Sequence, residues 1–388
     1  MSQPSHKKPH IVFYFSDAGG GHRSVAEAII EAMENDYGGL FTAEMVDFFK
    51  GFGPGPIRKM PDLYPEMVKA KHLYQASFYA TNGRARARVL TASLWPLMRS
   101  KMRKLVQAHP ADLVVSVYPL ATTAALKALG TRRPPFYTVV TDLITTHALW
   151  FDTRADRILL PTETARQRAL RYHMPPGKLE VVGLPVAAQH CAPVGNKLTL
   201  RQRLGWPTDL PMVLIVGGVE GMGPLARTAR AIDASGLRLG LVIICGRNLK
   251  LRAVLQAQTW ENPAFIHGFT RDMPDFMRAA DVIVTKAGSV TIAEALNANL
   301  PIILYGKVPG QEDGNVAFVE SEGAGIWAPK PQLVVRALTR WISRPEERQA
   351  VIEAARRAAR PDAAHRVARI LADRLRLKQQ AAMPFPSA

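Results

Sequence analysis

The sequence predicts an α/β protein with two doubly wound, Rossmann-like domains. Short apolar runs of strand length alternate with segments of helical periodicity in both halves of the 388-residue chain. Strands that alternate with helices favour parallel sheets covered by helices on both faces. A stretch rich in proline and glycine, from residue 185 to residue 211, separates the two series. We therefore expect one domain over residues 1–187, a second over 188–350, and a helical tail over 351–388 that can cross back to the first domain.

In the first half, each expected strand is an apolar run with little polar alternation, which is typical of strands buried on both faces. Such runs lie at 11–15, 43–46, 113–117, 136–140, 157–160 and 180–182. Helical patterns, with apolar residues three and four positions apart, lie between them at 24–33, 121–129 and 162–172.

The second half repeats this organisation. Strands are expected at 212–216, 239–244, 264–267, 281–285 and 301–305. Helices are expected at 223–234, 247–257, 272–279, 290–298 and 314–322, with a short one at 199–204 inside the break. The segment from 331 to 378 is helical in pattern and rich in arginine.

The composition, 47% hydrophobic and 21% charged, is that of a globular protein. The longest apolar runs fall far below the roughly 18 residues that cross a bilayer, so we expect no transmembrane segment. The first ten residues are polar, and we expect no secretion signal there. The two cysteines, Cys191 and Cys245, are too few for a disulfide framework, and we expect both to be buried in a reducing compartment.

The formal charge is +18, and its distribution points to a surface for polyanions. Between Arg58 and Lys104 there are eleven basic and only two acidic residues. Large apolar side chains, which include Phe52, Tyr64 and Trp95, are interleaved in the stretch from Phe48 to Lys104. Basic and aromatic residues together suit the headgroup region of an anionic membrane. The alternative is an ordinary solvated basic face over core aromatics.

The turn at residues 16–22 reads Ser-Asp-Ala-Gly-Gly-Gly-His, between an expected strand and an expected helix. Three glycines allow a ligand to approach the backbone closely. His22 would lie at a helix N-terminus, where the helix dipole disfavours the imidazolium, so a neutral imidazole could accept a proton. The alternative is that His22 only caps the helix or binds a phosphate.

Three loops in the second half also follow expected strands. Residues 217–223, Gly-Gly-Val-Glu-Gly-Met-Gly, offer amides for a diphosphate but lack the spacing of a dinucleotide fingerprint or a P-loop. Residues 286–294 begin a helix at Gly288 and Ser289 and place Glu294 where a carboxylate can accept the hydroxyls of a ribose. Residues 309–315 bring Gln311 and Glu312, which suit sugar hydroxyls. The alternatives are structural glycine turns, a solvated glutamate and an acidic capped turn.

All four loops would lie at the carboxyl ends of parallel strands, where α/β proteins bind ligands. Split between two such domains, they would face one another across a central cleft.

These residues carry a resemblance to a known family. The chain resembles monogalactosyldiacylglycerol synthase and the related bacterial diacylglycerol glucosyltransferases, and more distantly the lipid-linked N-acetylglucosaminyltransferase of peptidoglycan synthesis. The matching strings are the turn at 16–22, Gly-Gly-Val-Glu-Gly-Met-Gly-Pro-Leu at 217–225, Ile-Cys-Gly-Arg-Asn at 244–248, Thr-Lys-Ala-Gly-Ser-Val-Thr-Ile-Ala-Glu-Ala at 285–295, Leu-Pro-Ile-Ile-Leu at 300–304 and Pro-Gly-Gln-Glu-Asp-Gly-Asn at 309–315. The chain departs from the family pattern at Tyr118, Ala148, Val219 and Ser289-Val290.

The resemblance implies a GT-B fold and an inverting transfer of galactose or glucose from a UDP-hexose to diacylglycerol, at the cytoplasmic face of a membrane. It implies that UDP-sugar contacts come from Gly20, Gly21, Gly217, Gly218, Glu220, Gly221, Met222, Gly246, Arg247, Asn248, Gly268, Phe269, Lys286, Gly288, Ser289, Val290, Thr291, Glu294, Gln311, Glu312 and Asn315. The acceptor or the membrane would contact Phe52, Tyr64, Trp95, Tyr118 and His147.

An alcohol needs a base to act as a nucleophile at neutral pH, and we expect His22 to be that base, with Asp17 as a candidate to orient it. Amides at the helix starts would stabilise the leaving UDP, and no Asp-x-Asp metal motif is found where it would be needed, so we expect no metal cofactor. Three alternatives remain: transfer to a polyprenyl-linked acceptor, a UDP-sugar epimerase of the same fold, and a non-catalytic membrane- or nucleic-acid-binding protein. With a lipid acceptor we expect anionic lipids and no nucleic acid as partners.

Overall fold

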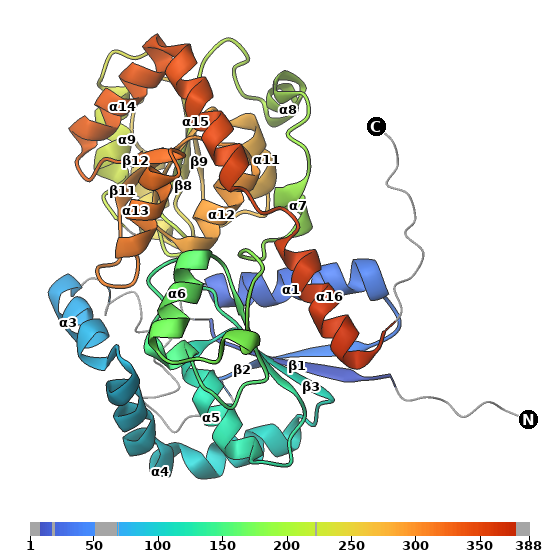
Figure 1. Ribbon diagram of the computed structural model, residues 1–388. Coiled ribbons are helices and arrows are strands. Elements are labelled where there is room, and N and C mark those ends of the chain that lie inside the picture. The colour runs from blue at the N-terminus through green and yellow to red at the C-terminus, as the bar shows by residue number, and fades with distance from the viewer. Residues whose placement is uncertain (1–7, 18–19, 51–67, 69, 222, 378–388) are drawn as a thin grey trace, which may run out of the picture. The chain divides into compact units, whose positions relative to one another are not determined.

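The computed structural model describes residues 8–17, 20–50, 68, 70–221 and 223–377 (Figure 1). These residues form two compact units. The first contains described residues up to 50, then 76–188 and 362–377, and the second contains 70–75 and 189–361. The C-terminal residues 362–377 therefore belong to the same unit as the N-terminal strand.

The first unit is built on a parallel sheet that has six strands over the described residues, in the order β2-β1-β3-β4-β5-β6. Its strands are β1 (His10–Phe15), β2 (Thr42–Asp47), β3 (Leu113–Ser116), β4 (Phe136–Val139), β5 (Arg157–Leu160) and β6 (Leu179–Val181). In the central pair β1 and β3, Ile11 lies opposite Leu113 and Phe13 opposite Val115. Every residue of β3 and β4 is buried, as expected for strands covered on both faces.

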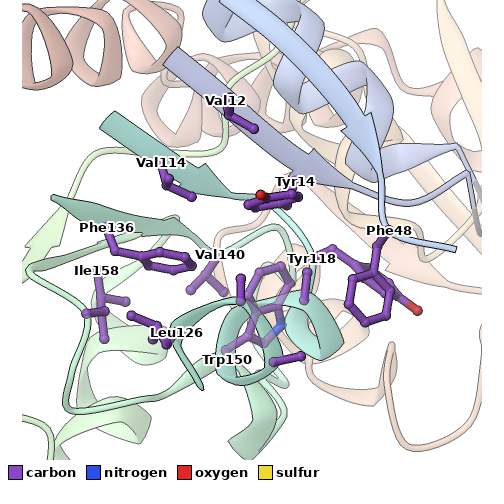
Figure 2. Packing of buried hydrophobic residues seen from close by; sticks show 14 of the residues in the cluster. Val12, Tyr14, Phe48, Val114, Tyr118, Leu126, Phe136, Val140, Trp150 and Ile158 are labelled. Atoms are coloured by element: carbon purple, nitrogen blue, oxygen red, sulfur yellow. The ribbon is translucent and has the colours of Figure 1, made fainter. Parts of the chain in front are cut away.

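Helices flank this sheet. They are α1 (Gly21–Tyr37), α4 (Arg84–Ala108), α5 (Pro119–Leu129), α6 (Glu163–Arg171) and α16 (Ala363–Leu375), with short 3₁₀ turns η1 (Ala148–Trp150) and η2 (Pro176–Lys178). Helix α3 (Lys71–Thr81) is divided between the units, with residues 71–75 in the second and 76–81 in the first. Helix α16 packs against α1, and α4 packs against α5 and η1. One core cluster joins the strand residues Val12, Tyr14, Val114 and Phe136 to Trp150, which is fully buried (Figure 2). Each such large apolar side chain contributes about 1.5–3 kcal/mol.

The second unit repeats the architecture with the strand order β12-β11-β10-β7-β8-β9, again six parallel strands among the described residues. The strands are β7 (Met212–Val216), β8 (Gly240–Ile244), β9 (Ala264–His267), β10 (Val282–Lys286), β11 (Ile302–Gly306) and β12 (Gly325–Trp327). Its helices are α7 (Ala188–Cys191), which starts at the unit boundary, α8 (Lys197–Leu204), α9 (Leu225–Asp233), α10 (Leu249–Gln256), α11 (Met273–Ala279), α12 (Ser289–Asn297), α13 (Asp313–Ser321), α14 (Pro331–Ser343) and α15 (Pro345–Ala358).

The predicted doubly wound α/β class is confirmed, and each predicted strand is found within two residues of its expected limits. Strand β12 and the helices α3, α4 and α7 were not predicted. Strand β12 and helix α7 are only three and four residues long. Helix α4 lacks a continuous apolar stripe, since its buried residues Ala87, Met102, Leu105 and Val106 lie near its two ends. Pro96 also lies inside α4, and an interior proline in the sequence argues against a helix at that position. No helix within the described residues is both long and apolar enough to cross a membrane.

Candidate functional site

The turn after β1 places His22 as the second residue of α1. Gly20 precedes the helix in the left-handed conformation, with φ of 77°, which glycine adopts without strain. The Ser24 amide donates to the Gly20 carbonyl oxygen at 3.2 Å and closes the first helical turn. This geometry puts the imidazole at the carboxyl end of β1, as the sequence predicted.

The His22 ring is held by neighbours from two other strand ends. Its Nδ1 lies 2.9 Å from Oγ1 of Thr141, which follows β4. The ring stands edge-on to Tyr118, which follows β3, with 5.0 Å between ring centroids. Burial lowers the pKa of His22 to about 4, although a hydrogen bond with the Val117 backbone acts in the opposite direction. The imidazole is therefore neutral at pH 7 and can accept a proton.

Asp17 lies in a different network. Its carboxylate accepts hydrogen bonds from Arg23 Nε at 2.5 Å and Nη2 at 2.9 Å, and from Lys50 Nζ at 3.4 Å. The hydrogen bond from Arg23 lowers the pKa of Asp17, so this carboxylate is charged and engaged. The group that contacts Nδ1 of His22 is the Thr141 hydroxyl, which sequence reasoning did not single out.

A buried carboxylate lies beside this histidine site. Asp142 follows Thr141, and its Oδ2 accepts a hydrogen bond from Trp150 Nε1 at 2.7 Å. Trp150 is 6.0 Å from the His22 ring centroid. Asp142 and Trp150 were missed because their signal is weak: a Thr-Asp pair after an apolar strand, and one tryptophan eight residues after that pair.

His147, Trp95 and Tyr118 differ in their surroundings. His147 Nδ1 accepts a hydrogen bond from the Leu149 amide, and its Nε2 lies 3.2 Å from Thr81 Oγ1, so both ring nitrogens have partners. Burial lowers its pKa to about 4. Trp95 packs against the core cluster, and Tyr118 is buried in it. The structure therefore brings only Tyr118 of these three to His22. The predicted contacts Phe52 and Tyr64 lie outside the described residues.

In the second unit, the glycine turns after β7 and β8 pack tightly against each other. A Cβ atom at Gly221 would lie 2.2 Å from the Cys245 carbonyl oxygen, and one at Gly246 would lie 2.2 Å from the Val219 carbonyl oxygen. Gly221 and Gly246 both have φ of 58°. The chain's own packing thus requires these glycines, and any larger residue would push the two turns apart.

Lys286 connects three loops. Its Nζ donates a hydrogen bond to Glu312 Oε1 at 2.6 Å, and Glu312 Oε2 accepts one from the Val308 amide at 2.7 Å. A Cβ atom at Gly218 would lie 3.0 Å from Lys286 Cε, and one at Gly288 would lie 2.9 Å from Nζ. The lysine side chain therefore runs between the two glycine turns that were predicted to bind a diphosphate.

Glu294, on α12, contacts a residue from outside the predicted set. His190 Nε2 lies 3.3 Å from Glu294 Oε1, and both side chains are largely buried. Burial raises the pKa of Glu294 to about 8 and lowers that of His190 to about 4, so both groups favour their neutral forms near pH 7. His190 Nδ1 is buried and has no hydrogen-bond partner among the described residues.

Several predicted residues shape the rim of this second site. Arg247 lies 3.5 Å from Glu220, and its guanidinium lies 5.8 Å from the centroid of Phe269, whose ring is 61% exposed. Asn248 caps α10 by accepting a hydrogen bond from the Leu251 amide. An exposed aromatic ring beside a guanidinium offers a flat surface for a nucleobase.

The remaining predicted residues lie around the start of α12. Asn315 Nδ2 donates to the Ala287 carbonyl oxygen at 2.8 Å and contacts Ser289 Oγ. Gln311 Oε1 accepts a hydrogen bond from the Tyr74 hydroxyl at 2.7 Å. Three further predicted residues are half-buried: Gly268, Val290 and Thr291. Gly21 is the first residue of α1 and therefore lies in the first unit. Met222 lies outside the described residues. In the described part of the chain, no group of three or more His, Cys, Asp or Glu side chains is placed to hold a metal ion.

Comparisons with known proteins match this chain along both units. A family profile described as monogalactosyldiacylglycerol (MGDG) synthase matches residues 22–186, and one described as the glycosyltransferase family 28 C-terminal domain matches residues 212–367. A probable MGDG synthase of Nicotiana tabacum is 36% identical over 378 residues, which cover 94% of this chain and 70% of that protein. A probable MGDG synthase 2 of Oryza sativa subsp. japonica is 37% identical and covers 86% of this chain and 74% of its own length.

Solved structures are similar in fold. The complex of S. aureus MnaA with UDP has a TM-score of 0.64 and 16% identity, over 95% of this chain and 98% of that one. The Acinetobacter baumannii MurG structure has a TM-score of 0.56 and 15% identity, over 94% of this chain and 99% of that one. Together with the two parallel sheets, these neighbours confirm the predicted GT-B fold.

Proposed function

The chain belongs to the monogalactosyldiacylglycerol synthase family, and we propose that it transfers galactose from UDP-galactose to the free hydroxyl of 1,2-diacylglycerol, with inversion at the sugar carbon. Family membership makes it a hexosyltransferase that acts on diacylglycerol. The observation that carries the choice of sugar is the identity of about one third to named galactolipid synthases over most of the chain. The residue roles below rest on the geometry of each unit.

We assign the UDP-sugar to the second unit. The start of α12 provides backbone amides and the positive end of a helix dipole, which suit a diphosphate. Lys286 adds a cation between the turns at Gly218 and Gly288. The exposed ring of Phe269 suits the uracil, and Glu294 suits the ribose hydroxyls, as acidic residues do in other nucleotide-binding folds.

We assign the acceptor hydroxyl to His22. As the acceptor oxygen bonds to the anomeric carbon, the bond from that carbon to the UDP oxygen breaks, and UDP leaves with the electron pair. The neutral imidazole takes the hydroxyl proton in the same step. Attack opposite to the leaving group inverts the configuration. The Thr141 hydroxyl can accept a hydrogen bond from the imidazolium that forms.

We propose that the reaction does not depend on a metal ion. Charge develops on the leaving UDP, and the Lys286 ammonium and the amides at the start of α12 can stabilise it without reorganisation. The test is turnover in excess EDTA and again in added Mg²⁺. We expect less than a twofold difference, and a loss of activity in EDTA that Mg²⁺ restores would refute this.

We propose that helices α3 and α4 place the first unit on an anionic membrane surface, at the cytoplasmic face. Leu73, Val89 and Leu97 are 70–73% exposed, an unusual fate for large apolar residues. The C-terminal half of α4 adds a set of basic residues: Arg99, Lys101, Arg103 and Lys104. Each basic side chain near an anionic surface contributes about 1 kcal/mol, and apolar side chains add by insertion among the headgroups.

The decisive experiment offers the purified protein radiolabelled UDP-galactose or UDP-glucose with diacylglycerol in vesicles, and then extracts the lipid. We expect label in a monoglycosyl lipid with UDP-galactose and at least tenfold less with UDP-glucose. No labelled lipid with either donor would refute the function, and equal labelling would refute the choice of sugar. Conversion of the UDP-sugar in vesicles without diacylglycerol would instead indicate an epimerase.

A further inference from the structure

The first unit contains a cavity of about 370 Å³ that the proposed reaction does not use. It lies between the N-terminal half of α4, helix α5 and the segment after η1, three elements that pack against one another (Figure 1). None of the site residues described above lines it. Buried apolar side chains of a small cluster, Ala87, Ala148 and Leu149, form part of its wall.

Four basic side chains line this cavity, against one carboxylate among the described residues. Arg84 and Arg88 come from α4, Lys127 from α5, and Arg154 and the carboxylate Asp152 from the segment after η1. Four cations around one cavity repel one another, and nothing in the fold of a helix pair requires that arrangement.

The single carboxylate is already engaged. Asp152 accepts hydrogen bonds from Arg154 Nε at 2.9 Å and Nη2 at 2.6 Å, and a third from Thr123 Oγ1 at 2.9 Å. The excess positive charge affects Lys127. Burial and, after it, the Arg154 guanidinium lower the pKa of the Lys127 ammonium group. Asp152 therefore neutralises one of the four cations.

The other three basic groups have donors to spare. The Arg84 and Arg88 guanidinium groups make no ion pair or hydrogen bond with any other residue that the structure describes. Lys127 Nζ donates to the Thr91 carbonyl oxygen at 3.2 Å, which leaves two of its three N–H groups. Donors from α4 and α5 thus line one partly open cavity.

We propose that this cavity binds a phosphate ester, with the phosphate among Arg84, Arg88 and Lys127. A phosphate monoester carries a charge of about −1.5 to −2 near pH 7, which matches the surplus better than a single carboxylate does. Guanidinium forks fit phosphate oxygens in pairs. The cavity is larger than an inorganic phosphate, and its apolar wall leaves room for the carbon skeleton of the ester. The ester is either a soluble metabolite or the headgroup of a membrane lipid.

Binding by two pocket variants, Arg88→Gln and Lys127→Met, is compared with binding by one control, Arg132→Gln. Arg132 lies in the same unit, in the loop after α5, is exposed, and does not line the cavity. Binding is measured by calorimetry with sodium phosphate and with glycerol 3-phosphate, at constant ionic strength in chloride. It is then measured by flotation with phosphatidylcholine vesicles that contain phosphatidic acid. Arg88 is exposed and free of protein partners, so its variant is expected to fold even if Lys127→Met does not.

We expect each pocket variant to weaken binding roughly tenfold or more, and the control to change it less than twofold for the soluble probes. If the soluble probes bind and the pocket variants lose them, the ligand is a soluble phosphate ester. If only the vesicles bind, and the pocket variants lose more than the control does, the ligand is a lipid headgroup. If no probe binds, or if no probe distinguishes the pocket variants from Arg132→Gln, the proposal is wrong. Galactose transfer is not among these readouts, so the outcome is independent of the proposed function.

Discussion

The two units each place a candidate functional side chain at the carboxyl end of a central strand, but the two side chains differ in charge. The turn after β1 leads to His22, which lies among Thr141, Tyr118 and Trp150 and whose lowered pKa keeps it neutral. The last residue of β10 is Lys286, a cation paired with Glu312. The same position at a strand end thus serves one site without charge and one site with charge.

This difference follows from what each half of a sugar transfer needs. A base must be neutral before it accepts a proton, and burial keeps His22 in that state. A leaving diphosphate needs fixed positive groups, and the Lys286 side chain lies beside the turns at Gly218 and Gly288.

The largest expected effect comes from removing the neutral group. We expect His22→Ala to lower kcat by about 100- to 10,000-fold, because a positioned base contributes that much to proton transfer. UDP affinity, measured by calorimetry, should stay within twofold, since we assign the nucleotide to the other unit. Turnover close to that of the unaltered protein would show that His22 only caps α1.

The next effect comes from removing the charged group. We expect Lys286→Met to lower kcat/KM by roughly 10- to 100-fold, the value of one charge-assisted hydrogen bond. The matched control is Lys307→Met, which removes a lysine paired with Asp313 on the loop after the neighbouring strand. Equal losses in the two variants would mean that Lys286 contributes no more to turnover than Lys307 does. The contrast between the units would then fail.

The sequence was sufficient to predict the strands and the turns because both are local patterns. Runs such as 212–216 are apolar throughout, and the glycines at 217–223 follow directly. The partners within each site could not be predicted in this way. Thr141 contacts His22 across 119 residues, and Lys286 meets Glu312 across 26, so only the parallel strand order brings them together.

The roles of glycine and glutamate show a second limit. Gly221 and Gly246 look like ligand-binding glycines in the sequence, yet each is required by a carbonyl oxygen of the opposite turn. Glu312 looks like a free hydroxyl acceptor, yet it is buried and bound to Lys286. Sequence patterns give residue types at a strand end but not the contacts that the packed turns make.

Both units expose large apolar residues, and a comparison of one leucine from each has a smaller expected effect. We expect Leu97→Asp, on α4, to weaken association with anionic vesicles about fivefold, because partial insertion of a leucine contributes about 1 kcal/mol. Leu198→Asp, on α8 of the second unit, alters a leucine that is 52% exposed and should change association less than twofold. Flotation with anionic vesicles measures the association of both variants. Equal losses of association would mean that α4 is not a membrane-binding surface.

The smallest expected effect is in the pH dependence of the neutral site. With a pKa of about 4, His22 stays unprotonated as the pH falls from 7.5 to 5.5, so kcat/KM should change less than twofold across this range. The sign follows from the depressed pKa: activity is retained above it and lost as the pH falls through about 4. An unshifted imidazole would instead lose about tenfold between pH 7.5 and 5.5. The measurement is kcat/KM against pH, with far-ultraviolet circular dichroism at each point to show that the protein stays folded. A fall centred near pH 6.5 would mean that solvent reaches His22, and the contrast between a dry, neutral site and a charged one would then be lost.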